Sequence, residues 1–75
     1  MTAQILIVDD DPVQRRLLEG AVNRLGYSAR LCDGGLPALD AMASDDAPFD
    51  AVLLDLLMPD IDGLEVMRRM RDRDI

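Results

Sequence analysis

The chain has 75 residues, 49% of them hydrophobic, and its fifteen acidic residues outnumber its eight arginines to give a net charge of −7. This balance argues against binding to nucleic-acid phosphates, which requires a basic surface. The absence of histidine excludes histidine-based acid–base chemistry and histidine metal ligands, and the single Cys32 excludes an internal disulfide or a zinc site built from several thiolates. The N-terminus lacks a secretory pattern and the apolar runs are too short to cross a bilayer, so we expect a cytoplasmic chain.

The first strand and helix are strongly indicated. Residues 5–8, Ile-Leu-Ile-Val, predict a strand buried on both faces, as in a parallel sheet. Asp11 is expected to cap the following helix, with Pro12 as its first residue and Gly26 at its end. One wide apolar face of this helix is predicted from Val13, Leu17, Leu18, Ala21, Val22 and Leu25.

The second unit is less regular. Residues 27–32 mix polar and apolar side chains, which favours a strand at the edge of a sheet. Asp33-Gly34-Gly35 predicts a turn, which by itself accounts for both glycines. A helix is expected over residues 36–43 with Pro37 in its first turn, followed by a polar loop over residues 44–48.

The third unit is again clear. Residues 49–54 predict a buried strand that ends at Asp55, and residues 58–63 form a turn-rich connection. An amphipathic helix is then predicted from the apolar residues Leu64, Val66, Met67 and Met70. Its solvated face is expected to hold Arg68, Arg69, Arg71 and Arg73. Alternating strands and helices predict an α/β fold with a parallel sheet and right-handed crossovers, in one domain or part of one.

The acids that follow the apolar strands are the candidate site. Asp9 and Asp10 come after the first predicted strand and Asp55 after the third. In open α/β sheets ligands bind beyond the carboxyl ends of the strands, so the three carboxylates converge there if these two strands are neighbours. Converging carboxylates call for a cation, and oxygen ligands without histidine or cysteine select Mg²⁺. A carboxylate in such a site can act as a nucleophile and form an aspartyl-phosphate.

A structural explanation competes with this one. Acids after strands often cap the next helix, and capping or solvation accounts for Asp9 and Asp10 as well as function does. It accounts poorly for Asp55, which lies among leucines. The segment from Asp60 to Gly63 matches a calcium-binding loop too poorly to predict one.

The acidic residues and their surroundings resemble a known family. Ile-Leu-Ile-Val-Asp-Asp-Asp-Pro at residues 5–12, then Asp55, then Met-Pro-Asp-Ile-Asp-Gly at residues 58–63 are similar in order and approximate spacing to the receiver domain of bacterial response regulators, in the CheY-like superfamily. The resemblance implies a flavodoxin-like, doubly wound parallel sheet. It also implies a phospho-accepting switch of a two-component system, rather than a turnover enzyme, that takes its phosphoryl group from a sensor histidine kinase.

The resemblance assigns roles to four residues. Asp55 would be the phosphoacceptor and a Mg²⁺ ligand, Asp10 a direct ligand, Asp9 a ligand largely through water, and Leu57 a ligand through its backbone carbonyl. Asp-Pro-x-Gln-Arg-Arg at residues 11–16 also resembles receivers attached to transcription activators that work with sigma factor 54. That similarity implies a covalently attached, DNA-binding output domain in the parent protein.

The chain departs from the family pattern in extent. A receiver has strands in the order 2-1-3-4-5, whereas residues 1–75 supply only the first three strand–helix units, so they are interpreted as the N-terminal part of a single receiver domain with order 2-1-3. The family's Ser/Thr after the fourth strand, its Lys after the fifth and its switch aromatic have no counterpart here. The third strand would then have a bare edge, and we expect self-association through it.

Two other functions remain open. A truncated receiver would act only as a protein-interaction or dimerisation module without phosphotransfer. A phosphohydrolase of the haloacid dehalogenase type would also form an aspartyl-phosphate, but such enzymes usually carry a second Asp two residues after the nucleophile, where this chain has Leu57.

Overall fold

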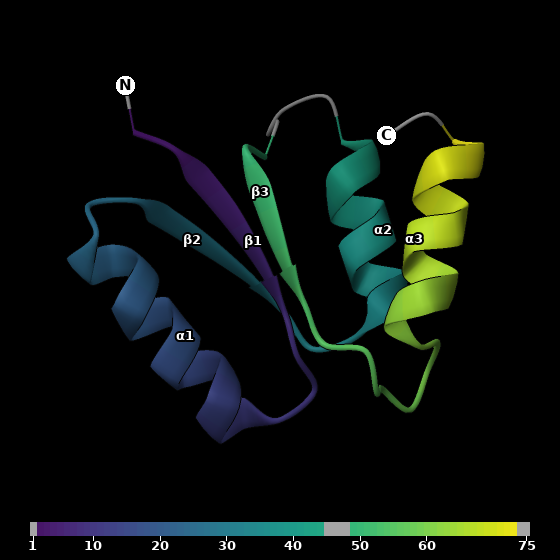
Figure 1. The fold of residues 1–75 in the computed structure, drawn as a ribbon, viewed down its shortest axis with the longest axis horizontal. Coiled ribbons are helices and arrows are strands. Elements are labelled where there is room, and N and C mark those ends of the chain that lie inside the picture. The colour runs from purple at the N-terminus through teal and green to yellow at the C-terminus, as the bar shows by residue number, and fades with distance from the viewer. Residues whose placement is uncertain (1, 45–48, 74–75) are drawn as a thin grey trace.

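The computed structural model describes residues 2–44 and 49–73 and forms a parallel sheet covered on both faces. Its strands β1 (Gln4–Val8), β2 (Ser28–Cys32) and β3 (Ala51–Leu54) lie in the order β2-β1-β3. Figure 1 shows α1 (Pro12–Arg24) on one face of the sheet, and α2 (Gly35–Ala43) and α3 (Gly63–Asp72) on the other. The predicted α/β fold class, strand order and edge position of the second strand are therefore confirmed.

The central strand explains how the sheet aligns. The side chains of residues 5–8 are all at most 8% exposed, because β1 has a strand on each side and helices on both faces. Val8 is paired with Cys32 of β2 and with Leu54 of β3, so the three strands end at the same level. The residues that follow β1 and β3 are therefore neighbours.

The first helix, α1 (Pro12–Arg24), is capped as predicted. The Asp11 carboxylate accepts a hydrogen bond from the Val13 N–H at 2.9 Å, Pro12 is the first helical residue, and Gly26 adopts a positive φ of 85° just after the helix. The Asp11 bond satisfies an N–H group that has no partner within the helix, and Pro12 has no N–H to satisfy.

The predicted apolar face of α1 is only partly buried. Val22 is buried and Leu18 half-buried beside Ile5 and Ile7 of β1. In contrast, Val13, Leu17 and Leu25 are 63–70% exposed. Successive helical residues are rotated by about 100° around the helix axis. A helix that contacts the sheet through Leu18 and Val22 therefore turns these exposed residues away from the sheet. The apolar face predicted from the sequence is therefore wider than the part of α1 that packs on the sheet.

The opposite face of the sheet carries α2 (Gly35–Ala43) and α3 (Gly63–Asp72). Leu6 and Val8 pack there with Ala38 and Ala41 of α2. The α3 helix packs mainly against α2, with Val66 fully buried. Leu64 and Met67 are 66% and 44% exposed, so the predicted apolar face of α3 is also narrower than expected.

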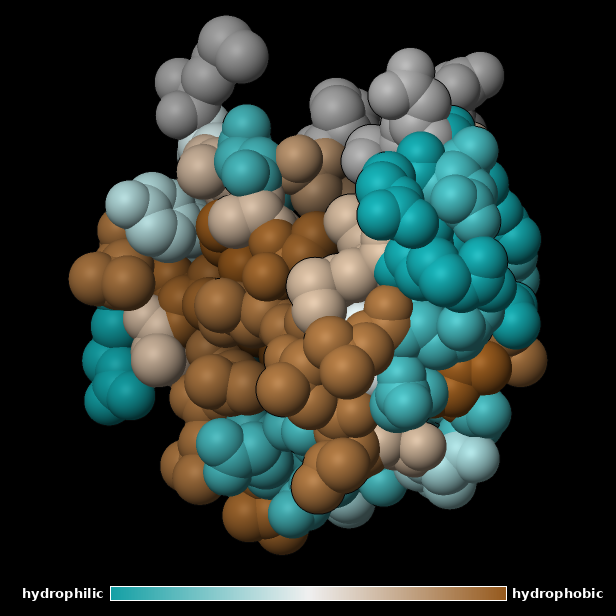
Figure 2. Space-filling view, turned by 45° about the vertical axis from the view of Figure 1, so that its right-hand side comes forward, coloured by the Kyte–Doolittle hydropathy of each residue, from teal (hydrophilic) through white to brown (hydrophobic). Residues whose placement is uncertain are grey.

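The third strand is less buried than predicted. Val52 and Leu54 pack into the core on the α2 side, whereas Ala51 and Leu53 are exposed, because α1 lies over β1 and β2 and leaves β3 uncovered. Within the described ranges no strand pairs with the outer edge of β3. Figure 2 shows a broad hydrophobic area across the centre and left of the molecule in that view.

Two further predictions concern the segments beside these elements. Of the polar loop predicted over residues 44–48, residues 45–48 lie outside the described part of the chain. None of the helices described has the length and hydrophobicity needed to cross a bilayer.

Candidate functional site

The structure brings the three candidate acids together. Asp9 and Asp10 directly follow β1 and Asp55 directly follows β3, and each offers a carboxylate oxygen within 4.8 Å of the other two. The pairing of Val8 with Leu54 causes this convergence, and the Asp55 N–H donates a hydrogen bond to the Val8 carbonyl at 2.9 Å. The predicted meeting of the acids at the carboxyl ends of neighbouring strands is therefore confirmed.

The three acids differ in their surroundings. Asp9 is only 6% exposed and is the one buried charged residue in the described part of the chain, whereas Asp55 is half-buried and Asp10 exposed. The Asp9 carboxylate accepts a hydrogen bond from the Asp11 N–H at 3.0 Å. The site therefore has a fixed buried wall and an open side.

Arg15 approaches this site from the first turn of α1. Its guanidinium donates a hydrogen bond of 2.8 Å to the carbonyl of Asp9, and its side chain is half-buried. In the helical pattern Arg15 lies outside the predicted apolar face of α1, which by itself indicates only a solvated side chain. Its position near the helix N-terminus, six residues after Asp9, was the available signal for this contact.

A short turn holds the carboxylate of Asp55. The Leu57 N–H donates a hydrogen bond to Asp55 Oδ1 at 3.2 Å, whereas the Leu57 side chain is 82% exposed. Leu57 therefore contributes its backbone to this part of the site. The turn continues into the loop of residues 56–62, whose ends are joined by a hydrogen bond of 3.0 Å from the Gly63 N–H to the Leu56 carbonyl.

Asp60 makes a contact that the sequence analysis missed. Its two carboxylate oxygens accept hydrogen bonds from the N–H groups of Gly35 at 3.1 Å and Leu36 at 2.9 Å, in the first turn of α2. These two hydrogen bonds hold the pKa of Asp60 below its usual range, and the bond from Leu36 has the larger effect. The available signal was the start of α2, where Gly34 has no side chain with which to cap the helix.

The explanation of the paired glycines by a turn alone is consequently corrected. Gly34 is in extended backbone, with φ −170°, which any residue adopts. However, a Cβ on Gly34 would lie 2.7 Å from Oδ2 of Asp60, and one on Gly35 would lie 2.6 Å from Ile61. Both glycines therefore allow the loop after β3 to approach α2 closely.

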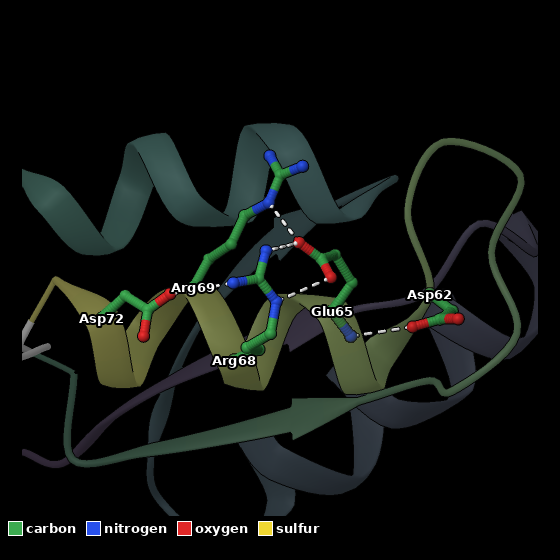
Figure 3. Close-up of polar contacts among 5 residues, drawn as sticks. All are labelled: Asp62, Glu65, Arg68, Arg69 and Asp72. Carbon is green, nitrogen blue, oxygen red and sulfur yellow. Dashed lines mark hydrogen bonds and ion pairs between the residues drawn. The ribbon is translucent and has the colours of Figure 1, made fainter.

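Two arginines of the predicted cluster, Arg68 and Arg69, pair with acids of their own helix. Figure 3 shows Glu65 between the guanidinium groups of Arg68 and Arg69, with Arg68 also paired to Asp72 at 2.9 Å. Hydrogen bonds from Arg68 and Arg69 lower the pKa of Glu65 to about 2. Asp62 caps the helix by accepting a hydrogen bond from the Glu65 N–H at 2.8 Å. This network supports the interpretation of the arginine cluster as a solvated helix face.

The acidic cluster fits Mg²⁺ in its donor chemistry and spacing. Carboxylate oxygens are the ligands that Mg²⁺ prefers, and two oxygens bound to one such ion lie at most about 4.2 Å apart. Oxygens within 4.8 Å of one another therefore need only a small side-chain adjustment or a bridging water to share an ion.

Comparison with known proteins identifies the family. The model of the response regulator receiver domain matches residues 5–75. The response regulator MprA of Mycobacterium tuberculosis H37Rv is 46% identical over 71 residues, a match that covers 95% of this chain and 30% of MprA. MprA of Mycolicibacterium vanbaalenii is 48% identical over 71 residues, with the same coverage.

Solved receiver structures share the fold. The response regulator TrrA of Thermotoga maritima, solved in complex with Mg²⁺ and BeF, has a TM-score of 0.87 and 36% identity, and the match covers 96% of this chain and 61% of TrrA. Chemotaxis protein CheY4 of Vibrio cholerae has a TM-score of 0.89 and 27% identity, over 99% of this chain and 60% of CheY4.

The matches cover most of this chain but only part of each relative. The chain spans about 30% of the length of the MprA relatives and about 60% of the solved receiver chains. The three acids that its sheet brings together lie within the matched residues, and the chain belongs to the response regulator receiver domain family.

Proposed function

We propose that the chain is the phospho-accepting part of a two-component response regulator, with Asp55 as the phosphoacceptor. The observation that carries this proposal is the convergence of Asp9, Asp10 and Asp55 within 4.8 Å in a chain of the receiver family. A carboxylate oxygen of Asp55 would attack the phosphorus of a phosphohistidine on a sensor kinase. The O–P bond of an aspartyl-phosphate forms as the N–P bond breaks, and the histidine nitrogen leaves with the electron pair.

Mg²⁺ is the cofactor that we propose for this transfer. Asp10 and Asp55 would hold it directly, Asp9 mainly through water, and Leu57 through its backbone carbonyl. When bound, the ion offsets the negative charge of the carboxylates and of the incoming phosphoryl group. The solved complex of TrrA with Mg²⁺ and BeF supports this proposal by analogy at 36% identity.

The chain's own residues prepare the nucleophile. The hydrogen bond from the Leu57 N–H orients the Asp55 carboxylate, and the partial exposure of Asp55 leaves it open to a phosphoryl donor. Asp9 is fixed by the Asp11 N–H on one side of the cluster. Chemistry of this kind modifies the protein once for each signal, so we propose a switch rather than a turnover enzyme.

The partners are proposed from relatives. TrrA has been solved in complex with the histidine kinase ThkA, which supports a sensor histidine kinase as the phosphoryl donor here. The curated relatives are response regulators more than three times the length of the matched segment, which supports an attached output domain in the parent protein. Control of transcription, including the similarity to sigma-54-dependent activators, stays a prediction about that domain.

A second candidate is an interaction module that does not accept phosphate. The exposed Leu53 on β3 and the broad hydrophobic surface in Figure 2 favour this alternative. The phosphohydrolase alternative has lost its support, because the chain belongs to the receiver family and has Leu57 where those enzymes usually carry their second Asp.

Intact-mass spectrometry after incubation with Mg²⁺ and acetyl phosphate separates the remaining two functions. We expect one phosphoryl adduct on the wild type and on the control variant Asp40→Asn, which changes an exposed acid of α2, and none on Asp55→Asn. A wild type that is folded by circular dichroism but gains no adduct would favour the interaction module. An adduct on Asp55→Asn would show that a residue other than Asp55 accepts the phosphoryl group.

A further inference from the structure

We propose that Asp60 is a positioning residue for the acidic site, because it fastens the loop that follows the phosphoacceptor to the start of α2. The inference rests on the proposed function, since it concerns how well the site around Asp55 is held for Mg²⁺. The loop of residues 56–62 leads directly from Asp55 and carries Leu57, the proposed backbone ligand.

The contact is bidentate and joins distant parts of the chain. Oδ1 of Asp60 accepts from the Gly35 N–H at 3.1 Å and Oδ2 accepts from the Leu36 N–H at 2.9 Å, across 25 and 24 residues of sequence. An ionised carboxylate that accepts two backbone hydrogen bonds at a helix N-terminus is favoured by both the bonds and the helix dipole. Asp60 therefore ties the loop to a preformed helix.

Two glycines at the start of α2, Gly34 and Gly35, leave room for this contact. The three atoms nearest to a Cβ built on Gly34 all belong to the Asp60 side chain, at 2.7–3.2 Å. A Cβ on Gly35 would lie 2.6 Å from Ile61 and 2.7 Å from Val66 of α3. Glycine at both positions therefore leaves room for the side chains of Asp60 and Ile61 beside the start of α2.

The contact adds hydrogen bonds to the middle of the loop, away from those at its two ends. The two ends of the loop are joined by the Gly63–Leu56 hydrogen bond, and Asp55 is bonded to the Leu57 N–H. Asp60 adds an attachment near the tip, three residues after Leu57. Without it, the middle of the loop would be held only by the packing of Met58 on the core and of Ile61 beside Gly35, and the Leu57 carbonyl would be less well placed.

A capping role for α2 alone would not require this arrangement. Ser, Thr, Asp or Asn at position 34 would cap the helix locally, as Asp11 caps α1 and Asp62 caps α3. The chain instead has Gly34 there and supplies the carboxylate from the loop after Asp55. The start of α2 and the loop beside the acidic site are thereby held as one unit.

A double variant separates positioning from capping. Asp60→Ala removes both hydrogen bonds, and adding Gly34→Ser supplies a local cap in the space that the Asp60 carboxylate vacates. We expect Asp60→Ala to speed amide hydrogen exchange at Leu36. Calorimetric titration should show Mg²⁺ binding weakened by about 10-fold, which is the low end of the loss seen when a residue that positions a metal ligand is removed. The double variant should regain protection at Leu36 but keep the weak Mg²⁺ binding.

Two controls complete the experiment. Asp62→Ala removes a cap of the same kind from α3 without touching α2, and should leave the Mg²⁺ affinity near that of the wild type. Asp60→Asn keeps one acceptor oxygen and should fall between the wild type and Asp60→Ala, provided that each variant is folded by circular dichroism.

The possible results are distinct. Equal Mg²⁺ affinity in the wild type and Asp60→Ala, or recovery of that affinity in the double variant, would overturn the positioning role and leave the proposed function intact. A folded wild type that binds no Mg²⁺ and gains no phosphoryl adduct would instead overturn the proposed function itself.

Discussion

Gly63 lies directly against the backbone of Asp55, and a Cβ on Gly63 would come within 2.7 Å of the Asp55 carbonyl oxygen. The same Cβ would lie 2.9 Å from the Cα of Leu56. These are backbone atoms, which cannot turn aside as the end of a flexible side chain can. The first residue of α3 and the residue that we propose as phosphoacceptor therefore hold each other in place.

We accordingly expect Gly63→Ala to destabilise the fold by about 1–3 kcal/mol, the usual cost of adding an atom to a closely packed site. It should also weaken Mg²⁺ binding, because the backbone at Asp55 must shift. Urea unfolding and calorimetric titration measure the two effects. Gly20→Ala is the matched control. Gly20 lies inside α1, and a Cβ there would meet no atom within 4 Å apart from its chain neighbours and the helix's own backbone, so the change should stabilise the chain by about 0.5–1 kcal/mol.

The acidic cluster predicts that removing one of its carboxylates stabilises the fold without Mg²⁺ and destabilises it relative to the wild type with Mg²⁺. In EDTA, Asp10→Asn should raise the free energy of unfolding by up to about 1 kcal/mol, because it removes repulsion from two nearby carboxylates. With saturating Mg²⁺ the wild type should become the more stable, since binding to the folded state adds stability. Thermal unfolding with EDTA and with Mg²⁺ checks both.

Asp40→Asn is the control for net charge in this experiment, because it removes an exposed acid of α2. It should show no reversal between EDTA and Mg²⁺. If Asp10→Asn and Asp40→Asn behave alike under both conditions, the cluster neither repels measurably nor binds the ion.

The sequence predicts the sheet and the acids well because both depend on local patterns. An unbroken apolar run such as residues 5–8 fits the centre of a parallel sheet, and an acid after such a run must lie at its carboxyl end. Once β1 and β3 are neighbours, the meeting of Asp9 and Asp55 follows from the register.

The contacts between distant segments were not predictable in this way. Asp60 and Gly34 each have an ordinary local explanation, in a turn-rich loop and a turn, and only the packing of the loop on α2 shows that they belong together. Similarly, the periodicity of α1 identifies its apolar residues but not which of them face the sheet. Leu17 and Leu18 are equally apolar, and the position of the helix leaves Leu17 63% exposed.

The ion pairs of α3 predict a stability difference that depends on pH. The pKa of Glu65 is about 2 in the folded chain and 4.5 ordinarily, so its ionised form stabilises the fold fully above about pH 4.5. This contribution is lost as the pH falls through about 2. Glu65→Gln should therefore be less stable than the wild type at neutral pH, with the difference shrinking between pH 4.5 and 2.

Chemical unfolding of both proteins across that range measures this difference directly. The pKa of Asp60 is also lowered, so its contribution to stability is likewise lost as the pH falls. Asp60 is present in both proteins, and its contribution therefore cancels in the comparison. A difference that stays constant from neutral pH to pH 2 would show that the Glu65 ion pairs contribute nothing to stability.

The outer edge of β3 predicts self-association of the 75-residue chain. Within the described residues its backbone pairs only with β1. Leu53 is on the α1 side of the sheet, where the helix covers β1 and β2 but not β3, and it is 40% exposed. An exposed apolar edge is a template for pairing with a second strand, and a charge on the edge opposes such pairing.

Light scattering should therefore give a wild-type mass that rises above the monomer with concentration, and Leu53→Arg should lower it. Leu64→Arg, at a still more exposed apolar position on α3, is the matched control for added charge and lost apolar surface, and should not lower the mass as much. A wild type that stays monomeric at high concentration would contradict the prediction. Equal effects of the two variants would assign association to the general hydrophobic surface, because only Leu53 lies on the strand edge.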